Sequence, residues 1–157
     1  MLTGSTAMNF YAQPRMTRDI DLVVALEPAD AERAVKLFET DYYISDEAVT
    51  QAIKRESVFN AVHLQSMIKV DVIVRKNSPF RKMEFERRVN FRVRNRDIWI
   101  ASKEDLIISK LFWAKDTFSE IQIRDIKNLV STGCDEMYIE NWSAQLNLSE
   151  LWKKCHQ

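Results

Sequence analysis

The pattern of apolar and polar positions predicts strands mainly in the first two thirds of the chain and helices mainly in the last third. Alternating apolar residues, typical of half-buried strands, occur at 19–26, 42–44, 58–64, 67–75, 91–93 and 98–101. Apolar residues three or four positions apart, which indicate amphipathic helices, occur at 31–38, 46–55, 79–89, 103–113, 119–131, 136–145 and 149–154. The chain is therefore predicted to be α+β up to about residue 101 and helical after it.

Two helix boundaries support this division. Ser102 is followed by acidic residues in the first turn, which is typical of a helix N-cap. Gly133 is a natural C-terminal stop for the second helix of the helical part. We expect residues 1–101 to form an α/β core and residues 102–157 to pack on it as a helical portion, the two making a single globular unit.

Length and composition exclude several classes of protein. A chain of 157 residues can bury a sizeable core without help from disulfide bonds or a structural metal. Lysine plus arginine and aspartate plus glutamate both total 23, so net charge gives no argument for nucleic-acid binding by bulk electrostatics. Cys134 and Cys155 lack the spacing of a zinc site or a disulfide framework.

The sequence contains no signal for a membrane. No apolar run approaches the roughly 20 residues that span a bilayer, and no basic region followed by an apolar stretch opens the chain. We expect a cytoplasmic protein with no membrane partner.

Two aspartates on the first predicted strand are the clearest chemical feature. Asp19 and Asp21 share one face of the strand, while Ile20 and Leu22 point into the core. Adjacent carboxylates repel unless a cation lies between them, and such oxygen ligands suit Mg²⁺ or Mn²⁺ with a phosphate-bearing substrate completing the shell. An Asp-x-Asp pair is also common on strand edges that bind no metal.

The Gly4-Ser5 pair precedes a short helical run and predicts a tight turn into a helix N-terminus. Free backbone N–H groups at such an end receive phosphate oxygens. Together with the acidic pair, this turn predicts a nucleoside triphosphate site.

This arrangement resembles the signature of the DNA polymerase β-like nucleotidyltransferase superfamily. That signature is an apolar residue, Gly-Gly or Gly-Ser, a spacer, and Asp-apolar-Asp/Glu-apolar; here Thr3 stands where the apolar residue is usual. The resemblance implies a nucleotidyltransferase fold, with a small mixed sheet flanked by helices and a third carboxylate on a neighbouring strand. Asp71 matches that position, although by itself it would equally fit a solvent-facing site on a half-buried sheet.

A second stretch, residues 101–111 continuing to 124–126, is similar to the C-terminal signature of the AbiEii-type branch, the nucleotidyltransferase-like toxins of bacterial toxin–antitoxin pairs. The likeness includes Arg15-x-Thr17-x-Asp19-x-Asp21 and Lys69-x-Asp71. It implies that Lys110 and Arg124 face the nucleotide and that Arg15 and Thr17 lie beside it. The alternative for each cation alone is a stem along an apolar surface with its charge in water.

The resemblance implies metal-dependent transfer of a nucleoside monophosphate from an NTP, such as ATP or GTP, to an acceptor hydroxyl, a reaction of the EC 2.7.7 type. In a two-metal scheme Asp19 and Asp21 hold both ions and Asp71 the ion that activates the acceptor, while Gly4 and Ser5 hold the triphosphate. The acceptor stays open between RNA such as tRNA, a protein, and a small molecule such as an antibiotic. A non-catalytic nucleotide-binding or interaction module of the same fold is the other alternative.

The remaining candidates are expected to be structural. His63 alternates with apolar neighbours on a strand. The four tryptophans are too scattered to form a stacking platform for bases, and we expect them to pack the core: Trp99, Trp113, Trp142 and Trp152.

The segment before Gly4 is short for the strand that this fold needs. Residues 1–3 can supply only about one pair of backbone hydrogen bonds to the strand at 19–24. Exposed strand edges recruit partners. We therefore expect this edge to be covered by self-association or by a partner chain such as an antitoxin.

Overall fold

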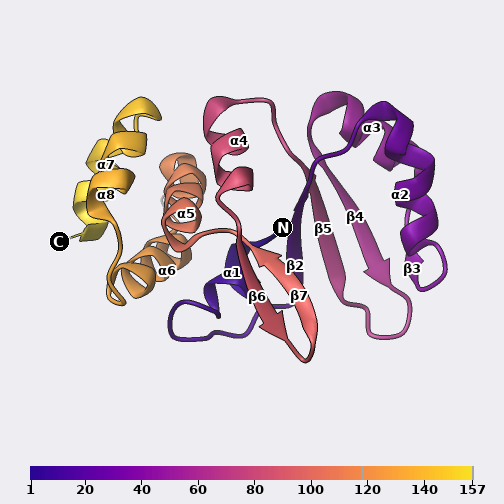
Figure 1. Ribbon diagram of the computed structural model, residues 1–157, viewed down its shortest axis with the longest axis horizontal. Coiled ribbons are helices and arrows are strands. Elements are labelled where there is room, and N and C mark those ends of the chain that lie inside the picture. The colour runs from indigo at the N-terminus through magenta and orange to yellow at the C-terminus, as the bar shows by residue number, and fades with distance from the viewer. Residues whose placement is uncertain (118, 157) are drawn as a thin grey trace.

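A seven-stranded mixed sheet organises the computed structural model, which describes residues 1–117 and 119–156 (Figure 1). The strands lie in the order β3-β4-β5-β2-β1-β7-β6. Only β2 with β5 and β1 with β7 run parallel; the other neighbours are antiparallel. The strands are β1 (Leu2–Thr3), β2 (Asp19–Val24), β3 (Tyr42–Tyr43), β4 (Val58–His63), β5 (Lys69–Val74), β6 (Val89–Val93) and β7 (Arg96–Ile100).

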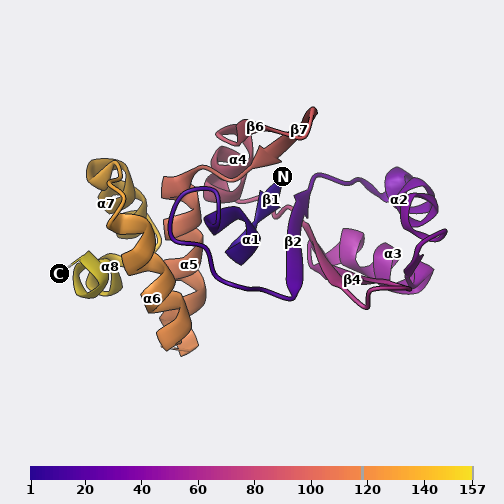
Figure 2. The same ribbon diagram turned by 90° about the horizontal axis from the view of Figure 1, so that it is seen from below.

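Helices lie at both ends of the molecule, with the strands between them (Figures 1 and 2). The group α2 and α3 lies beside β3 and β4, whereas α5 to α8 gather at the other end. The helices are α1 (Gly4–Met8), the 3-10 turn η1 (Pro28–Asp30), α2 (Ala31–Phe38), α3 (Asp46–Arg55), α4 (Pro79–Glu86), α5 (Lys103–Thr117), α6 (Glu120–Val130), α7 (Glu136–Gln145) and α8 (Ser149–His156). The predicted α+β class is confirmed.

Two apolar clusters hold these layers, and the strand that carries the aspartates joins them. One cluster packs α2 and α3 on the sheet, and the other packs β1 and β7 on α5 to α8. Ile20 and Leu22 of β2 contact both clusters. The backbone that presents Asp19 and Asp21 is therefore fixed from both sides.

Local capping signals explain most helix boundaries, with small shifts. Ser102 caps α5 as predicted, because its Oγ accepts a hydrogen bond of 3.2 Å from the backbone N–H of Asp105. Helix α3 is capped by Ser45, whose Oγ accepts a hydrogen bond from the backbone N–H of Ala48.

The β6–β7 turn is shorter than the strand pattern predicted, because that pattern left residues 94–97 between the two strands. It lies at Arg94 and Asn95, whose φ values are 46° and 64°, and Arg96 is already in β7. A two-residue turn with two positive φ values matches the right-handed twist of a hairpin, which moves the turn onto these residues.

Strand β2 has more partners than residues 1–3 suggested. Beyond its pairing with β1 at Leu22 and Asp21, the N–H of Val23 donates to the carbonyl of Met1, at 2.8 Å. At the start of β2 the carbonyl of Asp19 accepts bonds from the Thr6 and Thr17 hydroxyls. An uncovered β2 edge is therefore not the reason for association that the sequence predicted.

The tryptophans divide into two pairs. Trp152 is buried and Trp142 packs against the same cluster, as predicted. Trp99 and Trp113 have exposed fractions of 47% and 63%, so the prediction that they pack the core was wrong.

Across the described residues, no helix is both long enough and apolar enough to cross a bilayer.

Candidate active site

The three predicted carboxylates come together at adjacent strands. Parallel pairing of β2 with β5 places Asp21 opposite Asp71 and Asp19 opposite Lys69. Residues two apart on a strand share a face, so Asp19, Asp21, Asp71 and Lys69 lie on one side of the sheet. We call these four residues the carboxylate edge.

Electrostatics within this edge favour a bound cation. The pKa of Asp21 is raised, chiefly by burial and then by the negative charges of Asp71 and Asp19. The Lys69 ammonium lies 3.0 Å from Asp71 Oδ2. This hydrogen bond raises the pKa of Lys69, and the negative charges of Asp19 and Asp21 raise it slightly further. On the other side, Asn60 Nδ2 donates to Asp71 Oδ1. Lys110 and Lys69 offset these effects on Asp21 only in part, so its ionised form is costly.

Gly4 packs directly against Asp21 and has no room for a side chain. Its φ is +64°, a region that residues with a Cβ rarely adopt. A Cβ at this position would overlap Asp21 Oδ2 and lie 2.7 Å from Asp21 Cγ. The start of α1 and the carboxylate edge are therefore in contact.

Two cations and a buried acid form the other side of the site, which we call the Lys110–Asp125–Arg15 triad. Lys110 Nζ on α5 lies 2.8 Å from Asp125 Oδ2 on α6. Arg15 binds both oxygens of Asp125 through Nε and Nη2, each at 3.0 Å. Arg15 Nη2 also donates to Ser5 Oγ, which connects the triad to the start of α1.

The triad carries one net positive charge in a largely buried place. Burial lowers the pKa of Lys110, and the hydrogen bond to Asp125 offsets this only in part. Burial also acts to raise the pKa of Asp125, but the bonds from Arg15 and Lys110 outweigh it, so that pKa is lowered. A phosphate anion nearby would restore the stability of the Lys110 ammonium, because an opposite charge favours the ionised form.

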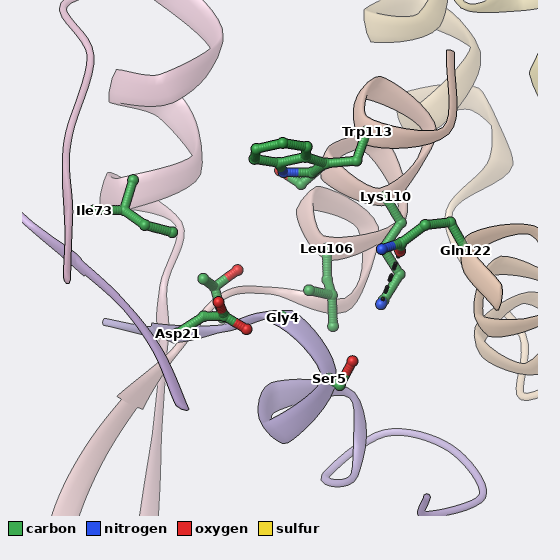
Figure 3. Close-up of a pocket in the computed structure, with 10 residues that line it drawn as sticks. Gly4, Ser5, Asp21, Ile73, Leu106, Lys110, Trp113 and Gln122 are labelled. Carbon is green, nitrogen blue, oxygen red and sulfur yellow. Dashed lines mark hydrogen bonds between the residues drawn. The ribbon is translucent and has the colours of Figure 1, made fainter. Parts of the chain in front are cut away.

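A pocket joins the carboxylate edge to the triad (Figure 3). Its cavity volume is about 160 Å³, and it opens to solvent. Figure 3 shows Asp21 and Ser5 on one side, Lys110 and Gln122 on another, and the Trp113 indole extending over the space toward Ile73. The pocket is lined by Thr3, Gly4, Ser5, Asp21, Ile73, Leu106, Ser109, Lys110, Trp113 and Gln122.

A second groove lies beside the same aspartates. Asp19 borders it, whereas Asp21 borders the pocket, so the carboxylate edge separates two open spaces. The groove is lined by Thr6, Met16, Thr17, Arg18, Asp19, Ile20, Ser66, Met67 and Ile68. Thr17, predicted to bind nucleotide, therefore lines the groove rather than the pocket.

The carboxylate edge offers oxygen donors of the kind that divalent cations bind. Within the described part of the chain, however, no three or more histidine, cysteine, aspartate or glutamate side chains are placed closely enough to hold a metal ion by themselves. The raised pKa of Asp21 beside two further carboxylates is nevertheless typical of a donor set that lacks positive charge. Mg²⁺ usually combines one or two carboxylates with substrate phosphates, so an incomplete cage suits it.

Sequence reasoning found most of this site and missed part of it. Arg124 is exposed on α6 and does not line the pocket, so its predicted role in nucleotide binding stays a prediction. The neighbouring Asp125 points inward instead, with Ile126 and Leu129 on the buried face of α6. Helical spacing from these apolar residues would have indicated Asp125. His63 bonds locally to Ser66, consistent with a structural role.

The fold matches solved structures of nucleotidyltransferase-like proteins. An antigenic nucleotidyltransferase-like protein from Paracoccidioides brasiliensis superposes with a TM-score of 0.64 at 16% identity, covering 98% of this chain and 78% of its own. The lincosamide antibiotic adenylyltransferase LnuA, solved with lincomycin bound, gives a TM-score of 0.55 at 18% identity, covering 83% of this chain and 85% of its own. At these identities the likeness establishes the fold: that of a nucleotidyltransferase.

Sequence comparison identifies the family. Residues 1–127 match the family described as nucleotidyl transferase AbiEii toxin, type IV toxin–antitoxin system. The chain belongs to this AbiEii family. No curated protein matches it significantly.

Proposed function

We propose that this protein transfers a nucleoside monophosphate from an NTP to an acceptor hydroxyl and releases pyrophosphate. One observation carries the proposal: the carboxylate edge lies between a pocket with cationic groups and a second groove. An NTP in the pocket and an acceptor in the groove would meet at Asp19 and Asp21. The acceptor oxygen would bond to the α-phosphorus as the bond to the pyrophosphate oxygen breaks.

The pocket residues have distinct tasks in this proposal. Ser5 and the backbone beside Gly4 contact the triphosphate tail. Lys110 contributes a compact charge. Arg15 does not line the pocket, but it holds Ser5 in place through Nη2 and adds positive charge beside it. Both cations are prepositioned by Asp125, so little side-chain ordering would remain to be done when the nucleotide binds.

A divalent cation is part of the proposal. Mg²⁺ or Mn²⁺ held by Asp19, Asp21 and Asp71 would supply Lewis-acid activation of the α-phosphate and the acceptor. Asp71 is kept in place by Asn60 and Lys69, and Asp21 by its contact with Gly4. These contacts fix the ligands before substrate binds.

The acceptor is proposed within the classes that the relatives suggest. The family is described as a toxin of a toxin–antitoxin system, which makes an antitoxin chain a proposed partner. RNA, including tRNA, and proteins are proposed acceptors for such a toxin, and LnuA, an antibiotic adenylyltransferase, supports a small-molecule acceptor as the alternative.

The proposal is tested with two forms of labelled NTP. Each NTP, labelled at the α- or the γ-phosphate, is incubated with Mg²⁺ and total tRNA, cell protein or a panel of antibiotics. We expect the α-label alone to enter an acceptor, because nucleotidyl transfer leaves the γ-phosphate in pyrophosphate. Entry of the γ-label would show phosphoryl transfer instead. Tight NTP binding without any transfer would favour the non-catalytic binding module.

A further inference from the structure

The pocket is lined by polar and by apolar groups, and the proposed function uses only the polar ones. Gly4, Ser5 and Lys110 offer hydrogen-bond donors and a positive charge, and Asp21 offers a carboxylate. The apolar lining comes from Ile73 on β5 and from Leu106 and Trp113 on α5. A nucleotide has the same division, with a charged triphosphate and a flat, weakly polar base.

The aromatic wall lies on the same helix face as the phosphate-binding lysine. Leu106, Lys110 and Trp113 are spaced four and three residues apart, so they lie on one face of α5. Trp113 is about one helical turn, roughly 5 Å along the axis, beyond Lys110. A ligand whose charged part reaches Lys110 would therefore extend its other part along the face toward Trp113.

The Trp113 side chain is presented to the pocket rather than buried in the core. Its exposed fraction is 63%, whereas Leu106 beneath it is 1% exposed. In Figure 3 the indole extends over the open space, with Ile73 on the far side. A flat ring that extends over an open pocket is a surface on which a planar aromatic ligand can stack.

We propose that Trp113 is the stacking platform for the base of the bound nucleoside triphosphate, with Ile73 as an apolar contact in the same pocket. The inference rests on the proposed function, because it takes the triphosphate to lie at Ser5 and Lys110. Stacking is available to any base, since every base has a π-face. Trp113 thus adds affinity for nucleosides over inorganic polyphosphates.

The test compares a nucleotide with a ligand that has the same charge but no base. Titration calorimetry measures the binding of a slowly hydrolysed NTP and of inorganic tripolyphosphate, both with Mg²⁺, to the full chain. We expect Trp113→Ala to weaken NTP binding roughly tenfold or more, the usual loss of an aromatic platform, and to leave tripolyphosphate binding unchanged. Trp113→Phe keeps a ring and should retain most of the affinity.

Trp99→Ala is the matched control, because Trp99 is also exposed but lies on β7 beside Arg88, outside the pocket. Trp99→Ala should change neither the affinity for the NTP nor the affinity for tripolyphosphate. Wild-type NTP affinity in Trp113→Ala would overturn the platform and leave the phosphate site standing. A wild-type protein that binds neither ligand would overturn the proposed function and the platform with it.

Discussion

At the scale of single residues, the contact between Gly4 and Asp21 is the most demanding feature of the site. Gly4→Ala should reduce transfer by on the order of 100-fold, because the new methyl group would displace a carboxylate needed in the transition state. Initial rates of label transfer measure this loss.

Gly133→Ala is a close control for this change. Gly133 also has a positive φ, of +78°, but a Cβ there meets nothing within 4 Å. It should lose only about 1–2 kcal/mol of stability from backbone strain and keep its activity. Equal activity in the two variants would contradict the role of the Gly4–Asp21 contact.

Asp21 should also determine part of the pH dependence of stability. Its pKa is higher in the folded protein than in the unfolded chain. At a pH between these two values, Asp21 is ionised in the unfolded chain but still protonated in the folded protein. The free energy of unfolding therefore falls as pH rises through this window, and the full cost of ionisation is present above the folded pKa.

Asp21→Asn removes that cost. In the metal-free protein this variant should melt at a higher temperature than wild type at neutral pH, and the difference should vanish below the ordinary carboxyl pKa. Thermal melts across pH measure it, with the exposed Asp41→Asn as a variant that should show no such gain. A lower melting temperature for Asp21→Asn at pH 7 would contradict the proposed charge repulsion.

At the scale of elements, the pairing of α5 with α6 places the positive charge that we propose binds the triphosphate. Lys110→Met keeps most of the side-chain stem but removes the ammonium, and should weaken NTP binding by about 1.5–3 kcal/mol, the usual contribution of a charge-assisted hydrogen bond. Arg124→Ala, on the exposed side of α6, tests the sequence-based prediction for that residue in the same titration. Unchanged affinity in Lys110→Met would remove the triad from the nucleotide site.

The elements were largely predictable because their signals are local. Helical spacing, the Ser102 cap and strand alternation fixed most helices and strands to within a few residues. The exact position of the turn at Arg94 and Asn95 was not predicted, because the sequence Arg-Asn-Arg has no glycine to mark the positive φ values. Arg124, and not Asp125, was predicted to face the nucleotide because the resemblance to the AbiEii-type branch implies that role for the arginine. Which of the two side chains points into the protein depends on how α6 packs.

At the scale of the whole molecule, the site is a product of topology. The order of the strands and the packing of α5 on β1 bring Asp21 and Lys110 to one pocket, with Asp19 and Asp71 beside Asp21 on the same face of the sheet. The exposure of Trp113 was likewise invisible, because a tryptophan at helical spacing usually packs a core. Long-range contacts of this kind have no local signal along the chain.

The central claim is that nucleotidyl transfer occurs at the carboxylate edge. The most direct measurement is the Mg²⁺-dependent entry of α-phosphate label from an NTP into an acceptor, by wild type and by Asp21→Asn under identical conditions. We expect transfer by wild type, its loss on chelation of the metal, and a loss of at least about 100-fold in the folded variant. Transfer by Asp21→Asn at the wild-type rate would contradict the claim.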